Sequence, residues 1–196
     1  MPESRRGPLI TWSEGPVDAE PVLLLHDRYA DHDQLDRFRA PLAGRHRVVR
    51  VRGARTQMED TYIKGYYWFI GPPERPELST FGDALHHLET LLLALAASAP
   101  AGKVALVGRG EGGTMALMLA LVWPERVSRV VSIGGPLPAN RAEFPLELRD
   151  GEGVRALLVP GAGPADGTAE ALRAVGWQVE TASDEGGAVD WLRAAA

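Results

Sequence analysis

The sequence predicts an α/β fold: a three-layer sandwich in which a mostly parallel sheet lies between helices on both faces. Short, wholly apolar runs such as residues 22–25 (VLLL) and 104–107 (VALV) are typical of strands buried on both faces. Segments with apolar residues at helical spacing alternate with these runs, and the alternation indicates parallel pairing with right-handed crossovers. The 196 residues, 45% of them hydrophobic, suit one core, so we expect residues 1–196 to form a single domain.

The first half of the chain contains three expected strands and one expected helix. Leu35, Phe38 and Leu42 recur at helical spacing and predict a helix within residues 31–42. Residues 52–76 show no clear period, and a structureless segment of that length in a compact domain is usually functional or disordered. The expected strands are residues 8–12, 22–25 and 47–51.

The second half of the chain gives stronger signals. Ser79 or Thr80 is expected to cap a long helix that extends to about Ser98, because Asp83 follows Thr80 at the spacing of a capping pair. Apolar residues form one stripe along this helix, as a core-facing helix requires. Further strands are expected at residues 104–107, 127–133, 154–159 and 177–181, and further helices at 113–121, 168–175 and 187–195.

Composition excludes several classes of function. The net charge of −5 argues against a nucleic-acid partner and gives no signal for a membrane surface. No apolar run approaches the ~20 residues that a bilayer span needs. The absence of cysteine excludes disulfides, thiolate metal sites and a cysteine nucleophile. No long apolar region follows the N-terminal arginines, so we expect no signal peptide and a cytoplasmic protein without cofactor or metal.

A glycine-rich corner joins the strand expected at 104–107 to the next helix. Residues 108–113 (GRGEGG) have the setting of the G-x-S-x-G nucleophile elbow, with Gly110 in the position of the serine. Side chains two residues before or after the tip of so tight a turn would collide with the neighbouring strand and helix. The tip conformation strains a serine by roughly 1–3 kcal/mol, whereas glycine adopts it without a clash. Glycine at the tip therefore removes the hydroxyl and relaxes the corner.

With this corner, the chain resembles the α/β-hydrolase superfamily, in particular its compact carboxylesterase and phospholipase-like branch. The resemblance covers most of the chain and implies that fold, with a ligand crevice at the C-terminal ends of the strands, above Gly110. It rests on the order and spacing of five segments: residues 22–31 (VLLLHDRYAD), 48–53 (VVRVRG), 65–69 (GYYWF), 104–113 (VALVGRGEGG) and 130–138 (VVSIGGPLP).

The resemblance implies a catalytic triad in the order nucleophile, acid, histidine, and this chain departs from it at two positions. Gly110 holds the nucleophile position. None of the five histidines lies after His87, whereas the family's base belongs near residues 182–191. Asp166 stands where the acid is expected. A serine needs a base to take its proton, and the base needs an orienting acid, so we expect that the protein is not a serine hydrolase.

The resemblance also implies an oxyanion hole built from the backbone N–H groups of Glu111 and of Asp27 or Arg28. Asp27 replaces a small glycine of the family, and its carboxylate would repel an anion. Trp68 belongs to an aromatic insert, which either lines an apolar pocket or covers the sheet edge as a satellite core. The expected pocket and oxyanion region comprises His26, Asp27, Arg28, Trp68, Gly110 and Glu111.

Several other polar residues have an ordinary interpretation beside a functional one. His26 ends a buried strand and is either a satisfied structural histidine or a site residue. Arg109 is expected to form an ion pair with a nearby acid. Two clusters are weak signals for a ligand: Asp27, Asp31, His32 and Asp33 for a metal, and Arg45, Arg47, Arg50, Arg52 and Arg55 for an anion.

The sequence favours a pseudoenzyme of the α/β-hydrolase fold that binds a small ligand or a protein partner. Three alternatives stay open: a lyase, isomerase or cyclase that uses acid or base groups such as His26, Asp27 or Tyr29; a structural subunit that dimerises with an intact paralogue; and an active esterase with an unconventional site. A homodimer also stays open. A ligand binder predicts an apolar pocket without converging acids. A non-covalent enzyme predicts Asp27, Glu111 or Tyr29 in the pocket. A structural subunit predicts a pocket filled by the aromatic insert and an exposed apolar patch elsewhere.

Overall fold

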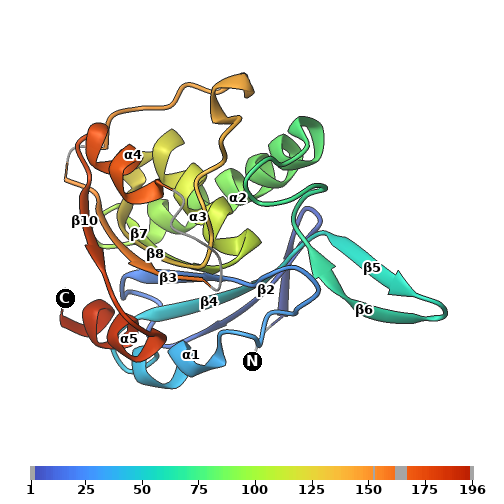
Figure 1. Cartoon of the computed structure of the whole chain (residues 1–196). Helices are drawn as coiled ribbons and strands as arrows, with labels where there is room; N and C mark the ends of the chain where they lie inside the picture. Colours follow the sequence, from blue (N-terminus) through green and yellow to red (C-terminus); the bar gives the residue numbers. More distant parts are fainter. Residues whose placement is uncertain (1–2, 152, 162–166, 195–196) are drawn as a thin grey trace.

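The computed structural model describes residues 3–151, 153–161 and 167–194. Its main feature is an eight-stranded sheet with the strand order β1-β2-β4-β3-β7-β8-β9-β10 (Figure 1). The strands from β4 to β10 in this order pair in parallel, and β1 and β2 add an antiparallel edge. The strands are β1 (Glu3–Arg6), β2 (Leu9–Glu14), β3 (Pro21–Leu25), β4 (Arg47–Arg52), β7 (Val104–Arg109), β8 (Val127–Ile133), β9 (Arg155–Val159) and β10 (Gln178–Thr181).

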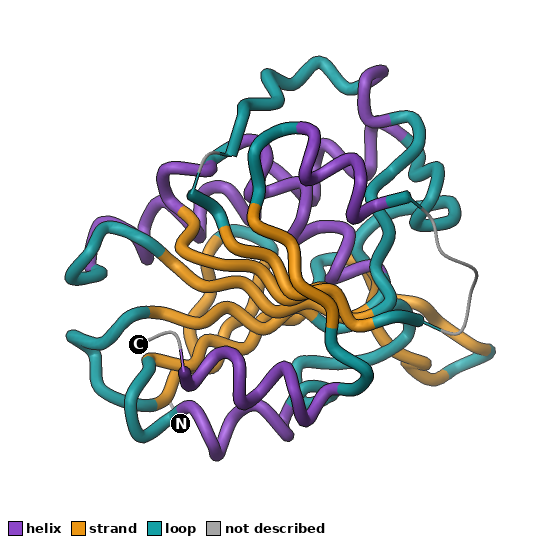
Figure 2. Tube along the Cα trace, turned by 60° about the vertical axis from the view of Figure 1, so that its left-hand side comes forward, coloured by secondary structure: helices purple, strands orange, loops and turns teal. Residues whose placement is uncertain are grey.

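Helices cover both faces of this sheet, as Figure 2 shows, so the predicted three-layer α/β fold is confirmed. The helices α2, α3 and α4 contribute their apolar side chains to one large core cluster. The helices α1 and α5 form a second cluster against the other face. The helices are α1 (Asp36–Leu42), α2 (Leu78–Ser98), α3 (Glu111–Val122), α4 (Thr168–Ala174) and α5 (Glu185–Ala194), with short 3-10 turns η1 (Pro124–Arg126) and η2 (Arg141–Glu143).

The central elements are buried on all sides, which explains their continuous apolar sequence. Every residue of β3 is buried, and so are the residues of α3 from Glu111 to Leu121. A strand covered on both faces and a helix enclosed by its neighbours have no solvated side that would need polar residues. Within the described residues, no helix combines the length and the apolar character that a bilayer crossing requires.

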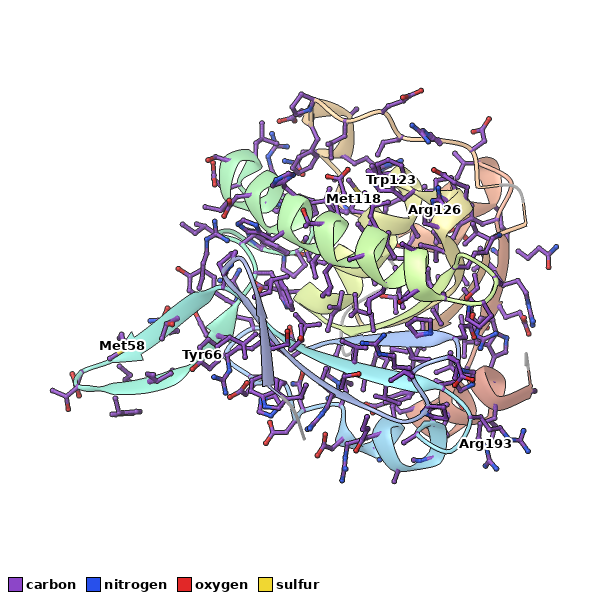
Figure 3. All side chains as sticks on the ribbon, turned by 180° about the vertical axis from the view of Figure 1, so that it is seen from behind. Met58, Tyr66, Met118, Trp123, Arg126 and Arg193 are labelled. Atoms are coloured by element: carbon purple, nitrogen blue, oxygen red, sulfur yellow. The ribbon has the colours of Figure 1, made fainter. Side chains whose placement is uncertain are left out.

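The expectation of a structureless segment at residues 52–76 is wrong for residues 55–67. Strands β5 (Arg55–Glu59) and β6 (Tyr62–Tyr67) form a separate antiparallel hairpin, which projects from the body of the molecule in Figure 1. Met58 lies on this projecting arm, away from the body (Figure 3). Most hairpin residues are exposed and the register shifts between Gln57 and Met58, so no alternation of apolar and polar residues marks the strands.

The long helix α2 begins earlier than the sequence indicates. The carboxylate of Glu77 caps it by accepting the N–H groups of Ser79 at 2.9 Å and Thr80 at 2.7 Å, so the helix starts at Leu78 and not at Ser79 or Thr80. A glutamate is an uncommon cap, and the pattern of threonine followed by Asp83 pointed one turn too far along the chain.

Glycines allow α3 to approach the central strands very closely. A Cβ atom added to Gly108 would strike the backbone of Gly112 and Gly113, and one added to Gly112 would strike the Leu25 carbonyl of β3. The predicted reason for small residues on both sides of the corner is therefore confirmed. Because the obstructing atoms are backbone atoms, no side-chain rotation makes room for a methyl group.

We expect Gly112→Ala to lower the free energy of unfolding by about 1–3 kcal/mol, because the added methyl group overpacks the contact between α3 and β3. The matched control is Gly82→Ala in helix α2, where an added Cβ has no neighbour within 4 Å. That substitution should stabilise the protein by about 0.5–1 kcal/mol through helix propensity. Urea unfolding measures both changes. Equal effects of the two substitutions would contradict the close approach.

Candidate functional site

The corner between β7 and α3 has the backbone geometry of a nucleophile elbow without its side chain. Gly110 lies at the tip with φ 48° and ψ −117°, a conformation that favours glycine. Its N–H group donates to the Ile133 carbonyl of β8 at 2.9 Å, and its carbonyl accepts the Thr114 N–H group at 3.0 Å. The corner is thus held from both sides by backbone hydrogen bonds.

The carboxylate of Asp27 occupies the space where a side chain at position 110 would stand. A Cβ atom added to Gly110 would coincide with the Asp27 carboxylate. The Oδ1 atom of Asp27 accepts the N–H group of Glu111 at 3.0 Å and that of Arg28 at 2.7 Å. These are the N–H groups that the family resemblance assigns to an oxyanion hole. In this chain an internal carboxylate fills that position, at the N-terminus of α3.

His26 has the environment of a structural histidine. The ring is buried, its Nε2 accepts the Gly53 N–H group at 2.9 Å, and its Nδ1 therefore donates to the Asp27 carbonyl at 2.7 Å. Burial lowers the pKa of His26, against smaller opposing contributions from the Asp27 carbonyl and from the carboxylates of Asp31 and Asp27. Both ring nitrogens are engaged, so the imidazole has no free nitrogen for proton transfer to a ligand.

Glu111 holds the aromatic insert in place. Its carboxylate is buried, accepts the Trp68 N–H group at 2.9 Å and forms an ion pair with Arg28. Burial raises the pKa of Glu111, and the Trp68 N–H group and Arg28 oppose that rise. The Arg28 side chain also donates to the carbonyls of Phe69 and Gly71. The side chains of Glu111 and Arg28 thus fasten the aromatic insert beside the corner.

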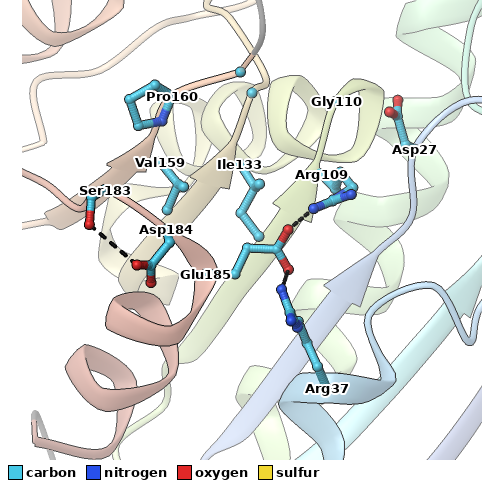
Figure 4. A pocket seen from close by; sticks show the side chains of 12 residues that line it. Asp27, Arg37, Arg109, Gly110, Ile133, Val159, Pro160, Ser183, Asp184 and Glu185 are labelled. Atoms are coloured by element: carbon cyan, nitrogen blue, oxygen red, sulfur yellow. Dashed lines mark hydrogen bonds and ion pairs between the residues drawn. The ribbon is translucent and has the colours of Figure 1, made fainter.

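A pocket of about 500 Å³ opens at the C-terminal ends of the central strands (Figure 4). Asp27 and Gly110 lie at one end of its described lining. Glu185, at the start of α5, lies between this end and the side formed by Ser183 and Asp184 (Figure 4); Arg37 binds it at 2.7 Å and Arg109 forms a second ion pair with it. The remaining described lining consists of Ile133, Gly134, Val159, Pro160, Gly161, Ser183 and Asp184.

The structure brings together only part of the residue set that the sequence suggested. Asp27 and Gly110 line the pocket, whereas His26, Arg28, Trp68 and Glu111 lie outside the described lining. Asp166, the suggested acid, lies outside the described residues.

Sequence reasoning also overlooked several lining residues. Glu185 lies in the segment where the resemblance sought a histidine, and that position was its only signal. Arg37 carried no signal, because it belongs to α1, far from the corner in sequence.

Several members of the clusters that invited a metal or an anion are engaged in ion pairs with one another or with neighbouring residues. Asp31 binds Arg52 at 2.6 Å and His32 at 2.7 Å. Burial opposes ionisation of Asp31, but these hydrogen bonds outweigh it and lower its pKa to about 2. Two further arginines of the basic cluster pair with Asp36 and Asp83. No group of three His, Cys, Asp or Glu side chains in the described part of the chain is arranged to hold a metal ion. The expected pairing of Arg109 with an acid is confirmed.

No protein-family model matches the sequence, and no curated protein matches it either. Solved structures do match the fold. A carboxylesterase from Mesorhizobium loti superposes with a TM-score of 0.73 at 19% identity, over 98% of each chain. A protein of unknown function from Agrobacterium tumefaciens gives 0.76 at 18% identity, over 94% of this chain and 96% of the other. A phospholipase/carboxylesterase from Dyadobacter fermentans gives 0.69 at 13% identity, over 87% and 84%. At these identities the matches show the fold, which is that of the α/β-hydrolases.

We expect the stability of the protein to fall between about pH 7 and pH 5, in part because of His26. Its folded pKa lies below the ordinary value of about 6.5, so the unfolded chain takes up the proton first. The stabilisation by neutral His26 is complete above pH 6.5 or so and is lost as the pH falls toward the folded pKa. His26→Gln should flatten this pH dependence in urea unfolding. His46→Gln is the comparison variant, because burial also lowers the pKa of His46 and this histidine contributes to the same pH dependence. An unchanged slope in His26→Gln would contradict the assignment.

We expect Gly110→Ala and Asp27→Gly to be coupled in a double-mutant cycle. Gly110→Ala alone adds backbone strain of about 1–3 kcal/mol and drives the Asp27 carboxylate off its two N–H donors. When Asp27→Gly has already removed the carboxylate, only the strain remains, so a coupling of about 0.5–3 kcal/mol should appear in unfolding free energies. The cycle of Asp27→Gly with Gly82→Ala is the additive control. Additivity in both cycles would show that Asp27 does not occupy this position.

Proposed function

We propose that the protein is a non-hydrolytic α/β-hydrolase-fold protein that binds a small polar ligand in the pocket above Gly110. The observation that carries this proposal is the position of Asp27. Its carboxylate replaces the side chain of a nucleophile at the corner and occupies the two N–H groups that would stabilise an oxyanion. An acyl-transfer site needs both the nucleophile and those N–H groups free.

No other described residue of the pocket supplies the missing parts of a triad. Ser183 is the one hydroxyl of the described lining, and its Oγ atom donates to Asp184 at 3.3 Å. The same described lining contains no histidine. Thr114, the hydroxyl nearest in sequence to the corner, is buried and donates to the Pro136 carbonyl at 2.9 Å. A hydroxyl without a base remains a poor nucleophile near neutral pH.

The shape and polarity of the pocket support a ligand, although not the apolar one expected from the sequence. The lining carries Asp27, Asp184 and Glu185 together with two arginines, so the expectation of an apolar pocket without acids is wrong. The cavity is also not filled by the aromatic insert, whose Trp68 and Phe69 are buried in the large core cluster instead. A volume of about 500 Å³ lies within the range of small-molecule sites.

A non-covalent enzyme finds less support in the same pocket. His26 is one of the groups that the sequence suggested for acid or base chemistry, but both of its ring nitrogens form hydrogen bonds within the protein. Tyr29 is 44% exposed and lies outside the described lining. Asp27 does line the pocket, as the sequence predicts for such an enzyme, but one of its oxygens is held by two backbone N–H groups.

We expect no turnover of p-nitrophenyl acetate and no labelling by a fluorophosphonate probe, in the native protein or in the Gly110→Ser variant. The variant gains a hydroxyl but no base, and its serine collides with Asp27. Asp27→Gly/Gly110→Ser removes the collision and should also stay inactive, because the base is still missing. An intact serine esterase under the same conditions shows that the probe is active. Robust turnover with covalent labelling of the native chain would overturn the proposed function.

A further inference from the structure

Side chains of both charges line the pocket. Asp27 lies at one end of the described lining, beside Gly110 (Figure 4). Its Oδ1 atom is held by two neutral N–H groups, and within the described part of the chain its Oδ2 atom has no hydrogen-bond partner and its charge no ion-pair partner. Main-chain N–H groups hold a carboxylate in place without cancelling its charge. A ligand ammonium group would supply both the missing donor and the missing charge.

Two arginines lie together at Glu185, in the middle of the described lining, between Asp27 and Asp184 (Figure 4). Arg37 and Arg109 both pair with the carboxylate of Glu185, and the charge of Arg37 also contributes to lowering the pKa of Asp184. The Arg37 side chain is 61% exposed and the Arg109 side chain 38%, whereas that of Glu185 is only 10% exposed. Each guanidinium has five N–H donors, and Glu185 satisfies only a part of them. The remaining N–H donors of the two arginines are suited to a ligand carboxylate.

Asp184 also lines the pocket, but its charge is used within the protein. Its Oδ1 atom accepts the Gly187 N–H group at 3.0 Å in the first turn of α5. This N–H group, outweighing burial, is the main reason why the pKa of Asp184 lies below its ordinary value. The partial positive charge of the helix N-terminus compensates Asp184, while Asp27 keeps an oxygen for a ligand.

Apolar side chains lie alongside Asp27 and the two arginines. Ile133 and Val159 end neighbouring strands and, with Pro160, line the wall of the pocket (Figure 4). Such a wall suits a short hydrocarbon chain between the charged groups.

We propose that the ligand is a small aliphatic amino acid, bound with its ammonium group at Asp27 and its carboxylate at Arg37 and Arg109. This inference rests on the proposed function, because it assigns a ligand class to the same pocket. It requires that neither charge alone be sufficient for binding: Asp27 would repel a simple carboxylate, and the two arginines would repel a simple amine.

Isothermal titration calorimetry of the full chain tests this with the unbranched amino acids from glycine to 6-aminohexanoate, with pentylamine and with pentanoate. We expect at least one amino acid to bind about tenfold or more tightly than either single-charge analogue. Equal or tighter binding of pentylamine or pentanoate would overturn the ligand class. So would the absence of binding by every amino acid of the series at millimolar concentration.

Two variants test the acidic and the basic groups of the pocket separately. In Asp27→Asn the side-chain oxygen can still accept the two backbone N–H groups, but the group that faces the pocket becomes an uncharged donor. This variant should bind the best amino acid about tenfold or more weakly and should lose the preference over pentanoate. Arg37→Gln, at an exposed position that does not threaten folding, should weaken binding similarly and lose the preference over pentylamine.

The exposed Glu147, outside the described lining, provides the control variant Glu147→Gln, which should bind like the native protein. Unchanged amino-acid affinity in both Asp27→Asn and Arg37→Gln would overturn the inference. The ester assay on the same preparations separates the two proposals. Hydrolysis would overturn the proposed function, whereas a non-hydrolytic protein that prefers a singly charged ligand would overturn the ligand class alone.

Discussion

One carboxylate oxygen determines the character of this site. Oδ1 of Asp27 accepts the N–H groups of Arg28, in the loop after β3, and of Glu111, the first residue of α3 after the neighbouring parallel strand β7. The same carboxylate occupies the space above Gly110 that a side chain would need. Glycine at the corner and aspartate after β3 are therefore two halves of one arrangement, since neither a serine nor a bound oxyanion fits while the carboxylate is there.

The residues around this carboxylate form structural contacts. His26 bonds to the Asp27 carbonyl and to the Gly53 N–H group, and its own carbonyl accepts the Trp68 indole N–H group at 2.7 Å. Glu111 accepts the Trp68 backbone N–H group and pairs with Arg28. A buried polar group destabilises the fold unless it forms hydrogen bonds or ion pairs. Four side chains here bond to one another or to nearby backbone groups: His26, Arg28, Trp68 and Glu111. The network fastens the aromatic insert to the corner, which is why the insert does not fill the pocket.

The charges that line the pocket are only partly paired within the described part of the chain. Arginines from α1 and β7 meet at Glu185, whereas Asp27 lies above Gly110 without an ion-pair partner among the described residues. The solved structures that share this fold include a carboxylesterase. Similarity of fold does not determine which side chains face the pocket. Several side chains that line the pocket stand at strand ends, which is where open α/β sheets bind their ligands.

The sequence alone determined the layers of the fold, because short buried strands and amphipathic helices leave different patterns of apolar residues. It also determined that the corner carries Gly110 in place of a hydroxyl residue and that no histidine follows His87. Local patterns failed at the exposed hairpin β5–β6, where neither face is buried. Only the tertiary structure decided that Asp27 meets the N–H group of Glu111, 84 positions away, and that Arg37 and Arg109 share Glu185. Such contacts depend on how parallel strands align their C-terminal ends, and no periodicity in a sequence records that alignment.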